Sequence, residues 1–150
     1  MNMIKGVKKA ELKTQVDEKG YLVEISEAKD SRFNKSCQIN LIGNFTRGAI
    51  KAFFKNAALW NCVIVSHGTA KIILVDGRKK SPTHKEINAF VLSSKNPGLI
   101  IIPPEVYFGW MPLEDDTQII NIASGTNKKK SDVSLIAPDF FGDIWTIKGR

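Results

Sequence analysis

The chain has 150 residues, of which 43% are hydrophobic and 25% charged, and it carries a formal charge of +7. This composition is typical of one globular domain that buries its own core, and it excludes disorder of the whole chain. No apolar run approaches the about 20 residues of a membrane helix, and residues 1–19 lack the apolar stretch of a secretory signal. We therefore predict a single soluble, cytoplasmic domain over residues 1–150, in which Cys37 and Cys62 stay reduced.

Short runs rich in β-branched and aromatic residues recur along the chain, with turn residues between them. A spacing of about 8–12 residues between such runs is typical of an all-β sandwich or barrel. Gly68 separates two of the runs and predicts a hairpin turn there. Helical periodicity is weak throughout. The predicted strands are 21–25, 36–42, 50–54, 60–66, 69–75, 86–92, 99–102, 117–123 and 145–147.

Several segments, in chain order, carry motifs of one known family. They are an acidic-basic-glycine turn, an Arg-Gly signature, an Asp-Gly-Arg segment followed by Ser-Pro-Thr, a Pro-rich aromatic loop and a closing Ile-Trp. Together they resemble the dTDP-4-dehydrorhamnose 3,5-epimerases, a cupin family of sugar-nucleotide enzymes, over residues of about 17–145. The resemblance implies a cupin-type jelly roll, a nucleotide-sugar ligand and a homodimer. The matching segments are Asp17–Gly20, Arg47–Ile50, Val75–Arg78 with Ser81–Thr83, Ile102–Trp110 and Ile144–Trp145.

The same resemblance implies a reaction whose side chains this chain lacks. Epimerisation beside a ketone needs a base, an acid and a group that stabilises the enolate oxygen. In the family these are a His, a Tyr and a Lys, with a second His in the Pro-rich loop. Here the two His positions correspond to Ile50 and Phe108, residues 118–121 contain no Tyr, and the Lys position falls near Asn61. We therefore predict no catalytic residue of the usual kind.

Five residues are candidates for ligand binding. The resemblance implies that Arg47 meets the anionic nucleotide, since a guanidinium suits phosphate oxygens, although a structural salt bridge is the competing interpretation. Lys19 and Arg78 are weaker candidates for the same contact, and a surface role is favoured for each. Tyr107 and Trp110 can stack on a base or a sugar, or pack in the core.

No metal site and no cofactor are predicted, because His67 and His84 are isolated and suit surface positions. We favour a cupin that binds a nucleotide sugar, in nucleotide-sugar or polysaccharide biosynthesis, with the epimerase residues lost. The first alternative is an active epimerase or isomerase with rearranged residues. The second is a basic β-domain that binds nucleic acid, although the positive charge also suits a small anion or a solvated surface.

Overall fold

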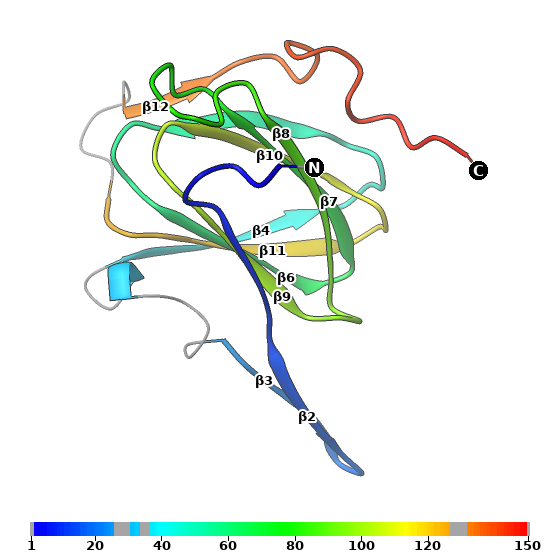
Figure 1. Cartoon of the computed structure of the whole chain (residues 1–150). Helices are drawn as coiled ribbons and strands as arrows, with labels where there is room; N and C mark the ends of the chain where they lie inside the picture. Colours follow the sequence, from blue (N-terminus) through cyan, green and yellow to red (C-terminus); the bar gives the residue numbers. More distant parts are fainter. Residues whose placement is uncertain (1, 26–30, 34–36, 127–131, 150) are drawn as a thin grey trace.

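The computed structural model describes residues 2–25, 31–33, 37–126 and 132–149. Two five-stranded antiparallel sheets face each other, in the orders β1-β9-β6-β11-β4 and β12-β5-β10-β7-β8, and β2 and β3 form a separate hairpin (Figure 1). The all-β cupin-type prediction is therefore confirmed. The elements are β1 (Lys8–Glu11), β2 (Lys13–Asp17), β3 (Gly20–Glu24), η1 (Ser31–Phe33), β4 (Gln38–Asn44), β5 (Lys51–Asn56), β6 (Asn61–His67), β7 (Thr69–Asp76), β8 (Ile87–Ser93), β9 (Gly98–Ile102), β10 (Val106–Pro112), β11 (Thr117–Ala123) and β12 (Val133–Leu135).

The main core lies between the two sheets, and strand alternation decides which side chains enter it. In β6, Val63 and Val65 point inward, whereas Cys62 and Ile64 pack in a second cluster on the outer face of the first sheet. That outer cluster is covered in part by Phe33 of η1. Cys37 is half-buried, and Cys62 is buried.

The outer face of the second sheet is covered by the chain that follows β12. Trp145 packs there against Phe53 with ring centroids 5.4 Å apart, and its indole nitrogen donates to the carbonyl oxygen of Pro138 over 3.1 Å. The predicted strand at 145–147 is wrong, because this segment is anchored through one buried tryptophan and pairs with no strand in the described structure. Ile147, two residues on, is 61% exposed.

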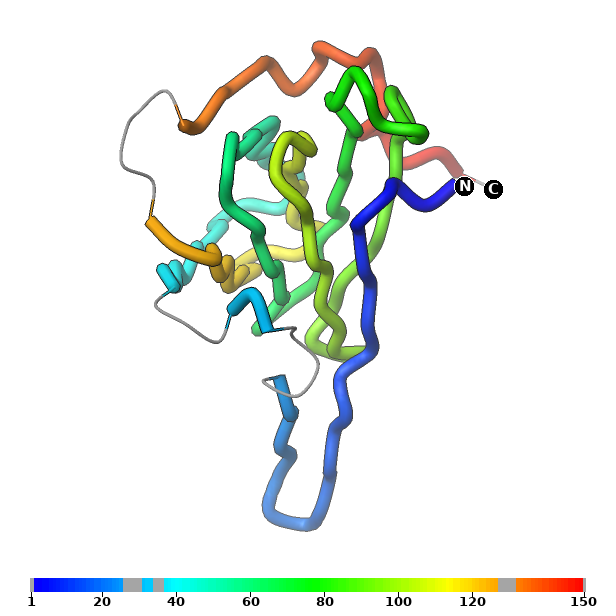
Figure 2. Tube along the Cα trace, turned by 60° about the vertical axis from the view of Figure 1, so that its left-hand side comes forward, coloured from blue at the N-terminus to red at the C-terminus, as the bar shows by residue number. Residues whose placement is uncertain are grey.

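The β2–β3 hairpin projects away from the sandwich, as Figure 2 shows. Every residue of β2 is exposed, so the hairpin has no packing surface on its own protomer along that strand. At the hairpin between β6 and β7, Gly68 has a φ of +81°, and a Cβ there would collide with Thr117. The turn predicted from Gly68 is therefore confirmed. No helix in the described ranges is long and apolar enough to cross a membrane.

Candidate ligand-binding cavity

A cavity of about 220 Å³ lies between the two sheets at one end of the sandwich. Strands β4, β6 and β11 of the first sheet form one wall, and β5, β10 and β12 of the second form the other. The described residues that line it are Gln38, Asn40, Ile42, Phe54, Asn56, Asn61, Phe108, Trp110, Asn121, Ala123 and Val133.

Three aromatic rings form part of the wall from the second sheet. The ring centroid of Phe54 lies 5.9 Å from that of Phe108 and 5.5 Å from that of Trp110. The indole nitrogen of Trp110 donates to Oδ1 of Asn44 over 3.1 Å, which fixes the orientation of the ring. The indole N–H of Trp110 therefore has its hydrogen-bond acceptor, and the apolar surface of the ring lines the cavity.

Carboxamides form the wall from the first sheet. Asn40 of β4 lies directly opposite Asn121 of β11, while Gln38 and Asn61 lie opposite Ala123 from its two sides. The β4–β11–β6 register thus gathers four amide side chains on one inner face, and Asn56 of β5 adds a fifth.

In two of these amides, the carbonyl oxygen is buried without a hydrogen-bond donor. Asn61 is only 2% exposed, and Oδ1 of Asn61 and Oδ1 of Asn121 are buried acceptors with no hydrogen-bond donor in the described structure. An unpaired buried acceptor costs about 1–3 kcal/mol. By contrast, the fully buried Asn88 accepts from the amide of Ile4 over 2.9 Å and donates to the carbonyl oxygen of Asn2 over 2.7 Å.

None of the eleven described lining residues carries an ionisable side chain. Proton transfer beside a ketone requires a group that gains and loses a proton near neutral pH, and an amide or an aromatic hydrocarbon does neither. The lining supplies stacking surfaces, hydrogen-bond donors and hydrogen-bond acceptors, which suit the binding of a neutral polar molecule.

Phe108 lines the cavity, and Ile50 does not. Ile50 packs on the outer face of the second sheet, in the cluster that contains Phe53 and Trp145. The β5 side chain that shares the cavity with Phe108 is Phe54, four residues further on. Ile50 and Phe108, which the resemblance matches to two histidines of one site, therefore do not face the same cavity. Phe53 and Phe54 point to opposite faces, as alternation predicts.

Arg78 belongs to a buried polar network outside the cavity. Its Nε donates to Oδ1 of Asp76 over 2.9 Å, and the hydroxyls of Ser81 and Thr83 donate to Oδ2 over 2.6 and 2.7 Å. Burial by itself raises the pKa of the Asp76 carboxyl, but these hydrogen bonds outweigh burial and hold the pKa well below its usual range. The Asp-Gly-Arg and Ser-Pro-Thr motifs thus act together as a structural unit.

Three other predicted residues lie on the outside. Lys19 is exposed at the turn of the β2–β3 hairpin. Arg47 is exposed in the loop after β4, where its backbone amide donates to Oδ1 of Asp115 over 2.8 Å. Tyr107 faces the cluster on the outer face of the second sheet, with its ring centroid 5.6 Å from that of Phe141 and 5.0 Å from Nζ of Lys55. Trp110 is the one predicted ligand-binding residue that the structure brings to the cavity.

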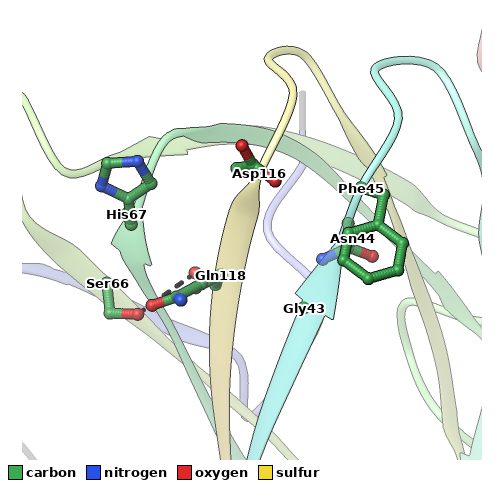
Figure 3. A pocket seen from close by; sticks show the side chains of 7 residues that line it. All are labelled: Gly43, Asn44, Phe45, Ser66, His67, Asp116 and Gln118. Carbon is green, nitrogen blue, oxygen red and sulfur yellow. Dashed lines mark hydrogen bonds between the residues drawn. The ribbon is translucent and has the colours of Figure 1, made fainter.

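A second concavity of about 450 Å³ lies on the surface at the other end of β6 (Figure 3). It contains Ser66, His67 and Asp116, which are residue types that form nucleophile relays. The hydroxyl of Ser66, however, donates to the carbonyl oxygen of Gln118 over 3.4 Å, and among the described residues no hydrogen bond joins the three. Among all the residues that the structure describes, no group of three or more His, Cys, Asp or Glu side chains could hold a metal ion.

Sequence reasoning missed the carboxamide wall and Phe54. The alternation in 36–42 does separate Gln38 and Asn40 from Ile39 and Leu41, but an apolar face normally points inward. Here Ile39 and Leu41 are 63% and 65% exposed, and the polar pair faces the cavity. A strand that turns its polar face inward is a signal of a polar binding site, and that signal was present in the sequence.

Comparison with known proteins identifies relatives of the whole domain. The family model described as dTDP-4-dehydrorhamnose 3,5-epimerase matches residues 2–145. The spore coat polysaccharide biosynthesis protein SpsL of Bacillus subtilis (strain 168) is 30% identical over 114 residues, which are 74% of this chain and 73% of SpsL.

Two solved structures share the fold. A dTDP sugar isomerase from Desulfovibrio desulfuricans G20 superposes with a TM-score of 0.80 at 21% identity, covering 91% of this chain and 87% of that one. ChmJ, a 3'-monoepimerase from Streptomyces bikiniensis solved in complex with dTDP-quinovose, superposes with a TM-score of 0.80 at 17% identity, covering 91% of this chain and 72% of its own.

Proposed function

The chain belongs to the dTDP-4-dehydrorhamnose 3,5-epimerase family, and on that basis we propose that it binds a nucleotide sugar without the family's acid–base chemistry. The observation that carries this proposal is the lining of the interior cavity, whose described residues are aromatic, aliphatic or amide and include no ionisable side chain. An enzyme that moves protons at carbon needs at least one such group within reach of the substrate.

The lining suits a sugar ring. Phe54, Phe108 and Trp110 offer apolar ring surface, against which the C–H face of a pyranose can pack, while the amides opposite offer donors and acceptors to its hydroxyls. At about 220 Å³, the cavity is smaller than the roughly 300–1,000 Å³ of pockets that enclose drug-sized ligands. It therefore suits the sugar alone, with the nucleoside diphosphate at the mouth.

The anionic part of such a ligand is favoured by the charge of the chain. The formal charge of +7 attracts a diphosphate at long range without a dedicated contact inside the cavity. SpsL is named for spore coat polysaccharide biosynthesis, and we place this chain in the same broad process of nucleotide-sugar and polysaccharide biosynthesis.

We also propose a homodimer. Val16 and Tyr21 lie opposite each other on the projecting hairpin and are 77% and 74% exposed, and Leu22 beside them is 55% exposed. An isolated two-stranded hairpin is marginal in water and needs a surface to pack against. A second copy offers such a surface in Ile39 and Leu41 on the exposed face of β4.

Two measurements on one sample test the proposed function. A dTDP-linked 4-keto-6-deoxy sugar is incubated with the protein in deuterated water, and the sugar C3 and C5 protons are followed by NMR, while titration calorimetry measures the affinity for dTDP-hexoses. We expect binding without protein-dependent deuterium uptake. Uptake that is abolished by Phe54→Leu would instead establish an active epimerase with rearranged residues.

A further inference from the structure

We infer that the sugar in this cavity presents a hydroxyl group, and not a ketone, to Asn61. The inference rests on the proposed function, and it states whether the sugar that the cavity selects carries a hydroxyl or a ketone at the position next to Asn61.

Asn61 is held rigidly at the cavity wall. It begins β6, an interior strand of the first sheet, and is paired with Ile102 of β9 on one side and Ala123 of β11 on the other. The backbone amide of the residue before it, Trp60, donates to the hydroxyl of Ser124 over 3.0 Å. Because the backbone of Asn61 is fixed on both sides, its amide can reach a hydrogen-bond partner only by rotation about the side-chain bonds toward the cavity.

The unsatisfied atom is an acceptor. Oδ1 of Asn61 is buried without a donor, and Oδ1 of Asn121 on the neighbouring strand is in the same condition. A sugar hydroxyl donates one hydrogen bond and accepts others, so it can satisfy both ends of an amide. A ketone oxygen only accepts, and placing it at this wall would leave the amide acceptors unpaired or set two acceptors against each other.

The energetic consequence is a preference between ligands. A site built to hydrogen-bond a hydroxyl discriminates strongly against an analogue that lacks it, because the protein group is then left buried and unpaired. We expect the hydroxyl form of a dTDP-hexose to bind about 10- to 100-fold more tightly than the 4-keto form, which corresponds to the loss of one such bond.

The same reasoning predicts an unusual mutational signature. Leucine has nearly the shape of asparagine, so Asn61→Leu removes a buried oxygen that has no hydrogen-bond donor and leaves the packing in place. The free protein should therefore melt at a higher temperature, while the affinity for the hydroxylated ligand falls about tenfold or more. Asn88→Leu is the matched control: it removes an amide whose two hydrogen bonds are both made, so it should lower the melting temperature and leave ligand selectivity unchanged.

The experiment combines calorimetric titration with thermal melts. The probes are dTDP-6-deoxyglucose, its 4-keto counterpart and a 4-deoxy analogue, which has no hydroxyl at C4 and, unlike a ketone, cannot hydrate. We expect wild type to prefer the first probe and Asn61→Leu to lose most of that preference. Equal or tighter binding of the keto or deoxy probe by wild type, or a lower melting temperature for Asn61→Leu, overturns the inference while leaving sugar-nucleotide binding intact. Failure of wild type to bind any of the three overturns the proposed function, and this inference with it.

Discussion

Two buried polar regions of this protein differ in whether their hydrogen bonds are complete. Around Asp76, which is 1% exposed, both carboxylate oxygens accept from Arg78, and Ser81 and Thr83 add hydroxyl donors. Around Asn61, which is 2% exposed, the acceptor oxygen has no donor in the described structure. A network whose hydrogen bonds are complete stabilises the fold by itself, whereas a network with an unpaired acceptor gains stability when a ligand supplies the missing donor.

The Asp76 network also holds the N-terminal segment against the body. The hydroxyl of Thr83 accepts from the amide of Lys5 over 3.0 Å, and Nη2 of Arg78 donates to the carbonyl oxygen of Lys5 over 2.6 Å. Because one network is complete and the other is not, substitutions in the two regions should have opposite consequences.

The largest expected effect is on stability, from Asp76→Asn. The substitution keeps the shape but removes the charge that Arg78 and two hydroxyls satisfy, and breaking a buried pair of this kind costs about 3–5 kcal/mol. We expect urea denaturation to show a loss toward the lower end of that range. The affinity for dTDP-hexoses should stay within twofold of wild type, and a parallel loss of affinity would mean that the two regions are not independent.

The pH dependence of stability should follow from the same carboxyl. Its pKa is lowered in the folded protein, so its contribution is fully present above the unfolded pKa of about 3.9 and is lost as pH falls toward the folded value. The free energy of unfolding should therefore decrease from pH 5 to pH 2. Asp76→Asn should flatten this decrease, and an equally steep curve in the variant would assign the acid sensitivity elsewhere.

A smaller effect on stability is expected from Trp110→Phe in the cavity wall. The variant removes the indole donor and leaves Oδ1 of the buried Asn44 unpaired, at about 1–3 kcal/mol. Ligand affinity should fall as well, because the ring is no longer held in place. A Trp110→Phe variant that unfolds at the same urea concentration as wild type would show that this hydrogen bond contributes little to stability.

The smallest effect on the folded protomer is expected from the hairpin. Val16→Lys together with Tyr21→Lys places charge on two exposed positions, so the stability of the protomer should change by no more than about 0.5 kcal/mol. Sedimentation should show the proposed dimer dissociating. Lys19→Glu at the hairpin turn is the control and should leave the dimer intact, and a variant that sediments like wild type would place the interface elsewhere.

Much of the fold could be predicted from local pattern. The strand at 117–123 has its predicted bounds, and Gly68 lies at the predicted hairpin. The strand at Val106–Pro112 was predicted only as a loop, since its motif resembled a Pro-rich loop and Pro103 and Pro104 precede it directly.

The site could be predicted less well, because it depends on register between distant strands. Phe108 pairs with Phe54 but Trp110 pairs with Lys51, so two steps along β10 match three along β5. Such a bulge reverses the alternation beyond it, so Ile50 and Phe54 face opposite sides of the sheet although they are four residues apart. The amide wall depends on register as well, because Gln38 and Asn40 line the cavity through the pairing of β4 with β11.

A crystal structure of the protein with a dTDP-hexose bound tests sugar binding in the cavity most directly. We expect the sugar ring between the aromatic side chains of Phe54 and Phe108 and the amide of Asn61, with a sugar hydroxyl donating to Oδ1 and the nucleotide outside the cavity. A sugar bound on the surface concavity beside His67, or an interior cavity that stays empty at saturating ligand, would contradict this expectation.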